Sequence, residues 1–82
     1  MSDLQRYRNL YKSTFSVEDE SLNENFKYQS HPHWDSLGHM SLIAAIESEF
    51  GINMDMDDVI DFDSYNKGIE ILEKYSINLN KG

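Results

Sequence analysis

Apolar residues recur at helical spacing through much of the chain. The clearest series follows Ser36, where steps of three and four connect Leu37, Met40, Ile43, Ile46 and Phe50. Such spacing puts one face of an α-helix against a core. Asp35 is a favoured N-cap residue and Gly51 a favoured C-terminal stop, so the pattern predicts a helix over residues 36–50. The expected core row is Leu37, Leu42, Ile43, Ile46 and Phe50, and the expected outward residues are Gly38, His39, Ser41, Glu47 and Ser48.

Weaker periodicity predicts three further helices. The first covers residues 3–15, and its inward side carries Leu4, Tyr7, Leu10, Tyr11 and Thr14. A short helix is expected over about residues 57–61, because Asp57 and Asp58 suit a first turn. The residues expected to face inward there are Val59, Ile60 and Phe62. The last helix is expected over about residues 64–75, capped by Asp63 or Ser64, with an apolar row of Tyr65, Ile69, Leu72 and Tyr75.

Residues 16–35 lack sustained periodicity and are predicted to form a long polar loop. A loop of that length in a small domain is normally functional or tied down. The expected tethers are Val17, Leu22, Phe26 and Tyr28. No strand-like alternation or internal repeat is found, so the predicted fold is all-α. We expect one domain over residues 1–82, a small four-helix bundle of three longer helices and one short one.

Composition narrows the possible functions. The net charge of −8 opposes nucleic-acid binding, which needs a basic face, and favours partners with basic patches. The chain has no cysteine, so any thiol chemistry requires a sulfur from elsewhere. No apolar run approaches the roughly 18 residues of a membrane span, and the charged first ten residues do not resemble a signal peptide. We therefore expect a cytoplasmic protein without stable membrane insertion.

Ser36 stands where a helix can best support a phosphate ester. The first N–H groups of a helix have no partner within it, and the positive end of the helix dipole stabilises a nearby anion by up to about 1 kcal/mol. With Asp35 as the cap, Ser36 falls in that first turn. The position therefore suits a phosphodiester.

The segment Asp35-Ser36-Leu37 at the start of an amphipathic helix resembles the attachment site of acyl carrier proteins, a family of phosphopantetheine-binding carriers. Residues 45–52 look like the segment that closes the second helix in this family. The acidic residues 55–58 look like its lead into a short third helix. The resemblance is strong over residues 34–59 and rests on pattern elsewhere.

The resemblance implies a covalent 4'-phosphopantetheine on Ser36, placed there from coenzyme A by a phosphopantetheinyl transferase. Asp35 would help present the serine or bind the Mg²⁺ of that transferase. The terminal thiol of the arm would hold an acyl group as a thioester, so the chain would be a substrate and not an enzyme. The implied role is delivery of acyl intermediates in fatty acid or specialised (polyketide, lipid or cell-surface) biosynthesis.

The resemblance also implies partners and surfaces. The partners would be acyl-loading, condensing and transfer enzymes with basic docking patches, met by a monomeric carrier. The docking residues would be Leu37, Met40, Glu47, Met54 and Asp58. The residues expected to line an acyl pocket are Ile43, Ala44, Val59, Phe62 and Ile71, although the same stripe also fits an ordinary core.

Two alternative functions stay open. One is a carrier of an amino acid or peptide, and the other is an unmodified acidic protein-interaction module. Several departures from the family pattern, among them Gly38 and Ser41 in place of acids, make a dedicated pathway as plausible as general fatty acid synthesis. If these two residues exclude the general enzymes, Gly38→Asp with Ser41→Glu is expected to improve acceptance by a generic malonyl transferase and to reduce turnover by the native loading enzyme.

Other chemistry is less well supported. Ser36 and His39 could touch as a hydrolase dyad, but no glycine-flanked elbow or oxyanion loop accompanies them. The other histidines, His31 and His33, lie close by in the sequence, and adventitious metal binding is the better interpretation. A calcium loop beginning at Asp55 would need Gly and Glu where the chain has Ile60 and Asn66. We therefore expect no resident metal.

Overall fold

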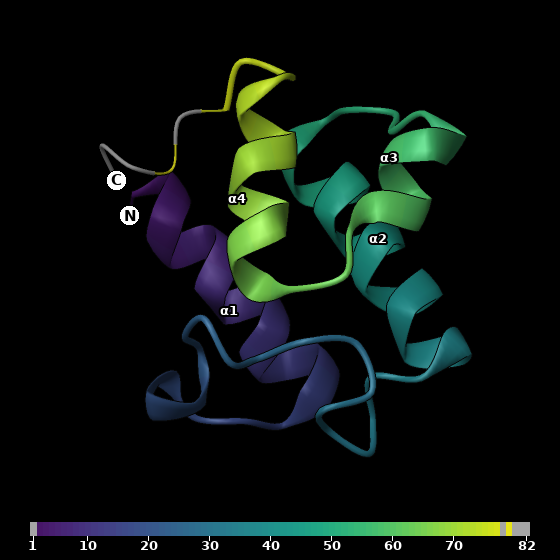
Figure 1. Ribbon diagram of the computed structural model, residues 1–82. Helices are drawn as coiled ribbons and strands as arrows, with labels where there is room; N and C mark the ends of the chain where they lie inside the picture. Colours follow the sequence, from purple (N-terminus) through teal and green to yellow (C-terminus); the bar gives the residue numbers. More distant parts are fainter. Residues whose placement is uncertain (1, 78, 80–82) are drawn as a thin grey trace.

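The computed structural model describes residues 2–77 and 79. These residues form four α-helices and one turn of 3-10 helix (Figure 1): α1 Asp3–Phe15, η1 Asp19–Ser21, α2 Ser36–Phe50, α3 Met56–Asp61 and α4 Tyr65–Glu73. Over this part of the chain the only β-pairing given is an isolated bridge between Lys27 and Ser64. The all-α prediction is confirmed. None of the helices in the described residues is both long and apolar enough to cross a membrane.

Side-chain caps explain where three of the helices begin. The Ser2 hydroxyl accepts the N–H of Gln5, and the Asp35 carboxylate accepts the N–H of Gly38 at 2.9 Å. Ser64, one of the two predicted caps of α4, accepts the N–H of Lys67 at 2.9 Å. Each bond satisfies a donor that the helix itself cannot use.

Helix α4 ends earlier than the predicted residue 75. After Glu73 the chain changes to i→i+3 bonds, in which the N–H of Lys74 donates to Ile71 and the N–H of Tyr75 to Leu72. Ser76 then takes a left-handed conformation with φ of 67°, which turns the chain away from the helix axis. Helix α3 begins at Met56, one residue before its predicted start.

The core is built around aromatic rings from distant parts of the chain. Tyr7, Tyr11 and Phe15 line the inner side of α1. The rings of Tyr11 and Phe15 contact Phe26 and Trp34 from the loop. The hydroxyls of Tyr7 and Tyr11 lie 2.8 Å apart, and burial raises the pKa of both. The remaining largest buried side chains are Leu42, Ile46, Phe62, Leu72 and Leu79.

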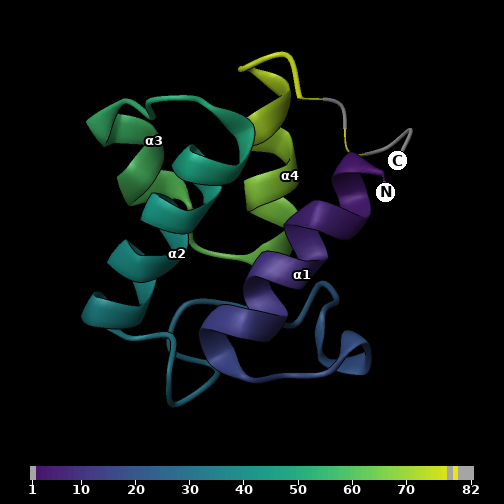
Figure 2. The ribbon, with the colours of Figure 1, turned by 180° about the vertical axis from the view of Figure 1, so that it is seen from behind.

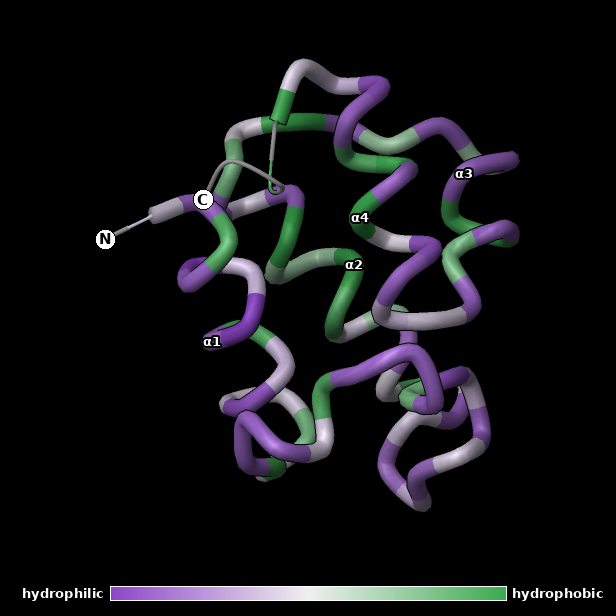
Figure 3. Tube along the Cα trace, turned by 60° about the vertical axis from the view of Figure 1, so that its left-hand side comes forward, coloured by the Kyte–Doolittle hydropathy of each residue, from purple (hydrophilic) through white to green (hydrophobic). Residues whose placement is uncertain are grey.

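The long loop crosses the end of the molecule where α1 finishes and α2 starts (Figure 1, Figure 2). Most of its residues are hydrophilic (Figure 3), but Val17, Leu22 and Phe26 are buried and Tyr28 is half-buried, as the tether prediction requires. Main-chain hydrogen bonds also fix the loop: the N–H of Tyr65 donates to the carbonyl of Phe26 at 2.9 Å. The loop therefore holds the start of α2 in a defined place.

Two residues predicted to face the core are on the surface. Leu37 is 81% exposed and Ile60 is 69% exposed, so both predictions are wrong. At 3.6 residues per turn, Leu37 points about 180° away from Ile46, a fully buried residue nine positions later. The three successive steps of three residues from Ile46 back to Leu37 add up to a rotation of about 180°, so the series leaves the buried face of the helix. His39 lies only about 20° from Ile46 by the same measure, and it proves to be half-buried instead of outward.

Candidate functional site

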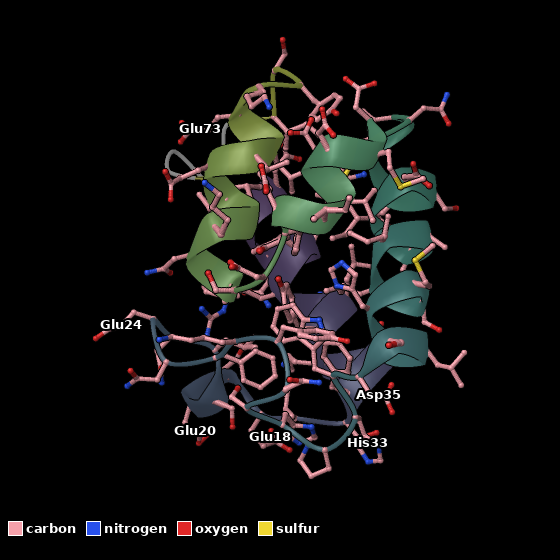
Figure 4. The ribbon with its side chains drawn as sticks, turned by 45° about the vertical axis from the view of Figure 1, so that its right-hand side comes forward. Glu18, Glu20, Glu24, His33, Asp35 and Glu73 are labelled. Carbon is pink, nitrogen blue, oxygen red and sulfur yellow. The ribbon has the colours of Figure 1, made fainter. Side chains whose placement is uncertain are left out.

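Ser36 is the first residue of α2 and its side chain is exposed. Its Oγ lies 3.2 Å from the hydroxyl of Tyr28, which comes from the loop. Asp35 precedes it at the foot of α2 (Figure 4), where one carboxylate oxygen caps Gly38 and the main-chain carbonyl accepts the N–H of His39 at 2.8 Å. The serine hydroxyl therefore stands at a firmly capped helix start and faces solvent.

A pocket of about 330 Å³ opens beside Ser36, between α2 and α3. Its lining consists of Tyr28, Ser36, His39, Met40, Met56, Val59, Ile60, Phe62 and Asp63. Val59 and Phe62 were expected in an acyl pocket and do line this one. The other expected lining residues do not: Ile43 and Ile71 are buried in the core and Ala44 is exposed. Ala44 lies about 160° around the helix from Ile46, which explains why it faces away.

His39 closes the inner side of the pocket. The indole N–H of Trp34 donates to its Nδ1 at 3.1 Å, and an indole can only donate. The ring proton therefore resides on Nε2, which donates to the carbonyl of Val59 at 2.8 Å. Since both ring nitrogens are occupied within the protein, His39 is not placed to serve as a base for Ser36. Its contacts connect the loop, α2 and α3.

An exposed hydroxyl at a helix start, with a mostly apolar pocket beside it, suits an arm that begins as a phosphate ester and continues as a flexible chain. Residues 34–69, which contain Ser36, α2 and α3, match the model of the phosphopantetheine attachment site family. Over these residues the chain is similar to phosphopantetheine-binding domains. The predicted resemblance to phosphopantetheine-binding carriers is thereby confirmed, and the matched family carries the predicted cofactor, covalent 4'-phosphopantetheine. No curated protein matches the chain.

Domains of this family are typically non-catalytic carriers that meet a phosphopantetheinyl transferase and biosynthetic enzymes. Three of the four exposed large apolar side chains in the described residues line the pocket, and the fourth, Leu37, follows Ser36 directly. Leu37 and Met40 were expected to dock partners and are 81% and 57% exposed. Met56 and Ile60, which the sequence did not single out for docking, are 71% and 69% exposed. The sequence of α3 did not reveal that these two side chains are exposed, because a helix of six residues is too short to show an amphipathic pattern.

The two acids expected to dock partners are engaged within the carrier. Asp58 has a side-chain exposure of 7% and receives hydrogen bonds of 2.6 Å from both Lys74 and Tyr75. Glu47 is half-buried and accepts the N–H of Met54 at 2.8 Å. Met54 is itself packed against the core. Asp58 thus connects α3 to the residues that follow α4, and Glu47 connects α2 to the residues before α3, so none of the three expected docking residues is fully exposed.

Acid should weaken the pairing of Asp58. The hydrogen bond from Lys74, followed by that from Tyr75, holds the pKa of Asp58 below its usual range. A carboxyl with a lower pKa in the folded state stabilises the fold fully above about pH 4, and this contribution is lost as the pH falls through the folded pKa. We expect the free energy of unfolding, measured in urea at successive pH values, to fall less steeply below about pH 4 in Asp58→Asn than in the parent.

Asp61→Asn is a matched control, since Asp61 is an exposed acid of the same helix. It should retain the parental pH dependence. A slope for Asp58→Asn that equals the parental slope would count against the role of this pair.

The carrier's three histidines do not assemble a metal site. His31 and His33 have ring centroids 5.3 Å apart on the loop, while His39 is held inside by Trp34 and Val59. Within residues 2–77 and 79, no group of three or more histidine or acidic side chains is placed to hold a metal ion.

Gly38 has a packing role that the sequence did not reveal. A Cβ at this position would overlap the carbonyl oxygen of His33 and would come within 3.1 Å of the Phe15 ring. The residue was expected on the outward side, yet the loop and α1 cover it. The absence of an acid at position 38 thus follows from internal packing, and it says nothing by itself about which enzymes the carrier meets.

Proposed function

We propose that this chain is an acyl carrier that holds its cargo through 4'-phosphopantetheine attached to Ser36. The observation that carries the proposal is the exposed Ser36 hydroxyl at the start of α2, directly on the edge of the pocket between α2 and α3. When bound, the group supplies a terminal thiol that holds an acyl group as a thioester. Because the chain has no cysteine, that thiol is the only one in the modified protein.

Ser36 would act as the nucleophile when the transferase modifies the carrier. Its oxygen forms a bond to phosphorus of the phosphopantetheine part of coenzyme A, 3',5'-adenosine diphosphate leaves, and the hydroxyl proton passes to a base of the transferase. Asp35 supports this step from the carrier side. One carboxylate oxygen is used by the helix cap, and a carboxylate has a second oxygen that can bind the Mg²⁺ of the transferase.

The pocket favours an acyl cargo over an amino acid or peptide. Apolar side chains of Met40, Met56, Val59 and Ile60 supply most of its wall, and methionine adapts well to chains of different shape. The charged α-amino group of an aminoacyl cargo would find only Asp63 as an acidic partner there. The aminoacyl carrier remains the alternative, and the match to an attachment-site family argues against an unmodified interaction module.

Docking of partner enzymes is proposed on the surface that surrounds Ser36. We define this surface as Leu37, Met40, Met56 and Ile60, the exposed large apolar residues within residues 2–77 and 79. Acids border it, including the exposed Asp35, Asp57 and Asp61. Basic patches on loading, condensing and transfer enzymes would complement those acids, while the apolar residues supply contact area. A dedicated biosynthetic pathway and general fatty acid synthesis both fit this surface.

Intact mass provides the direct test. Incubation of the full chain with coenzyme A, Mg²⁺ and a broad-specificity phosphopantetheinyl transferase should add one phosphopantetheine to the parent and none to Ser36→Ala. The substitution should cost the fold no more than about 1 kcal/mol, because the helix cap is Asp35. Ser41→Ala is the matched control, an exposed serine of the same helix, and should be modified normally. Modification of Ser36→Ala would remove Ser36 as the attachment site.

A further inference from the structure

We propose that Tyr28 is a positioning residue for the prosthetic arm: its hydroxyl holds the phosphodiester on Ser36 at the mouth of the pocket between α2 and α3. The inference rests on the proposed attachment at Ser36 and adds a residue from outside the helix. Tyr28 is eight positions earlier in the loop, yet its hydroxyl lies 3.2 Å from Ser36 Oγ and its side chain lines the same pocket.

The main chain around Tyr28 is fixed from two directions. Its N–H donates to the carbonyl of Asp63 at 2.8 Å, which ties it to the connection between α3 and α4. The next N–H, of Gln29, donates to the carbonyl of Trp34 at 2.9 Å, which ties it to the residues just before α2. Gln29 adopts φ of 68°, a left-handed conformation that is uncommon for a residue with a Cβ. The backbone that carries the Tyr28 side chain is therefore held in one conformation.

The ring of Tyr28 is fixed as well. It packs edge-on against His39, with centroids 5.7 Å apart and planes at 74°. His39 cannot easily yield, because Trp34 and Val59 hold its two nitrogens. With backbone and ring both restrained, the hydroxyl reaches Ser36 with little conformational freedom left to lose, which is the arrangement expected of a supporting residue.

Modification changes what Tyr28 can do. In the unmodified chain either hydroxyl can be the donor of the bond between Tyr28 and Ser36. Once Ser36 Oγ is bonded to phosphorus it carries no proton, so Tyr28 must donate. The best acceptors within reach are then the anionic oxygens of the phosphodiester, and hydrogen bonds to such oxygens are shorter and roughly twice as strong as neutral ones. Tyr28 thus gains a stronger bond upon modification, and the arm starts at the edge of the pocket.

The test uses the full modified chain, Tyr28→Phe and the control Tyr75→Phe. Tyr75 also loses a hydrogen-bonded hydroxyl, the donor to Asp58, but it does not line the pocket. The deciding measurement is the ³¹P resonance of the phosphodiester, compared with its position in the same protein unfolded in urea. In Tyr28→Phe the resonance should move at least halfway from the folded parental position towards the unfolded one, whereas Tyr75→Phe should keep the parental position.

Two results overturn the proposal: a ³¹P resonance in Tyr28→Phe that coincides with the parent, or an equal displacement in Tyr75→Phe, which would show general loosening of the fold. Far-ultraviolet circular dichroism ensures that the spectra come from folded protein. Failure of the underlying attachment is recognised separately, because the parent would then gain no mass from the transferase and no phosphodiester resonance would exist to compare.

Discussion

Gly38→Asp should destabilise the carrier by about 3 kcal/mol or more, because a side chain at this position overlaps backbone and not only movable atoms. The carbonyl of His33 stands where the Cβ would go, and the Phe15 ring closes the remaining space. Relief requires the loop to withdraw from α2. Urea unfolding followed by circular dichroism at neutral pH should show a much lower midpoint than for the parent.

Ser41→Glu is the appropriate control for Gly38→Asp. Ser41 is an exposed residue of α2, and a new acid there should change the free energy of unfolding by no more than about 0.5 kcal/mol. The sequence alone had suggested that both acids together adapt the carrier to general enzymes, and the packing of Gly38 makes that pair unsuitable. A Gly38→Asp protein as stable as the parent would show that the loop does not rest on α2 in solution.

Trp34→Ala should cost about 3–5 kcal/mol, the usual range for removing a buried tryptophan. Trp34 is completely buried, stacks on Phe15 with ring centroids 5.4 Å apart, and donates its N–H to His39. A domain of this size is expected to have only about 4–12 kcal/mol of total stability. The variant should therefore be largely unfolded well below the urea concentration that unfolds the parent.

Leu37→Ala supplies the contrast for Trp34→Ala. It also shortens a large apolar side chain at the start of α2, but Leu37 is 81% exposed and the change should cost no more than about 0.5 kcal/mol. Circular dichroism must be used for both proteins, since Trp34 is the only tryptophan. If the two variants lose equal stability, Trp34 does not anchor the loop in the way described.

Local signals were sufficient for the framework of the fold. Asp35 and Gly51 mark the two ends of α2, and the structure uses both as cap residues. The apolar spacing in α1 and α4 likewise depends on neighbours in sequence, so the all-α architecture followed without knowledge of tertiary contacts. The attachment-site motif could likewise be located from neighbouring residues in the sequence alone.

Contacts between distant residues limited the prediction of the site. Asp58 looked like a surface charge, and its burial depends on Lys74 and Tyr75 from the end of another helix. His39 looked outward because polar residues usually are, and its place inside depends on donors and acceptors from the loop and α3. A count of 3.6 residues per turn from Ile46 would have placed His39 inside and Leu37 outside. The contact of Tyr28 with Ser36 had no local signal of any kind.

The close fit of the loop over Gly38 also has an evolutionary side. The carbonyl of His33 leaves no room for a Cβ at position 38. A single substitution there would therefore give a poorly folded protein, and any gain in partner recognition could not be selected. A change at that position becomes accessible only together with a change in the length or course of the residues just before Trp34. The loop and the first turn of α2 should consequently diverge as one unit, and surface residues such as Ser41 remain the ones free to drift towards new partners.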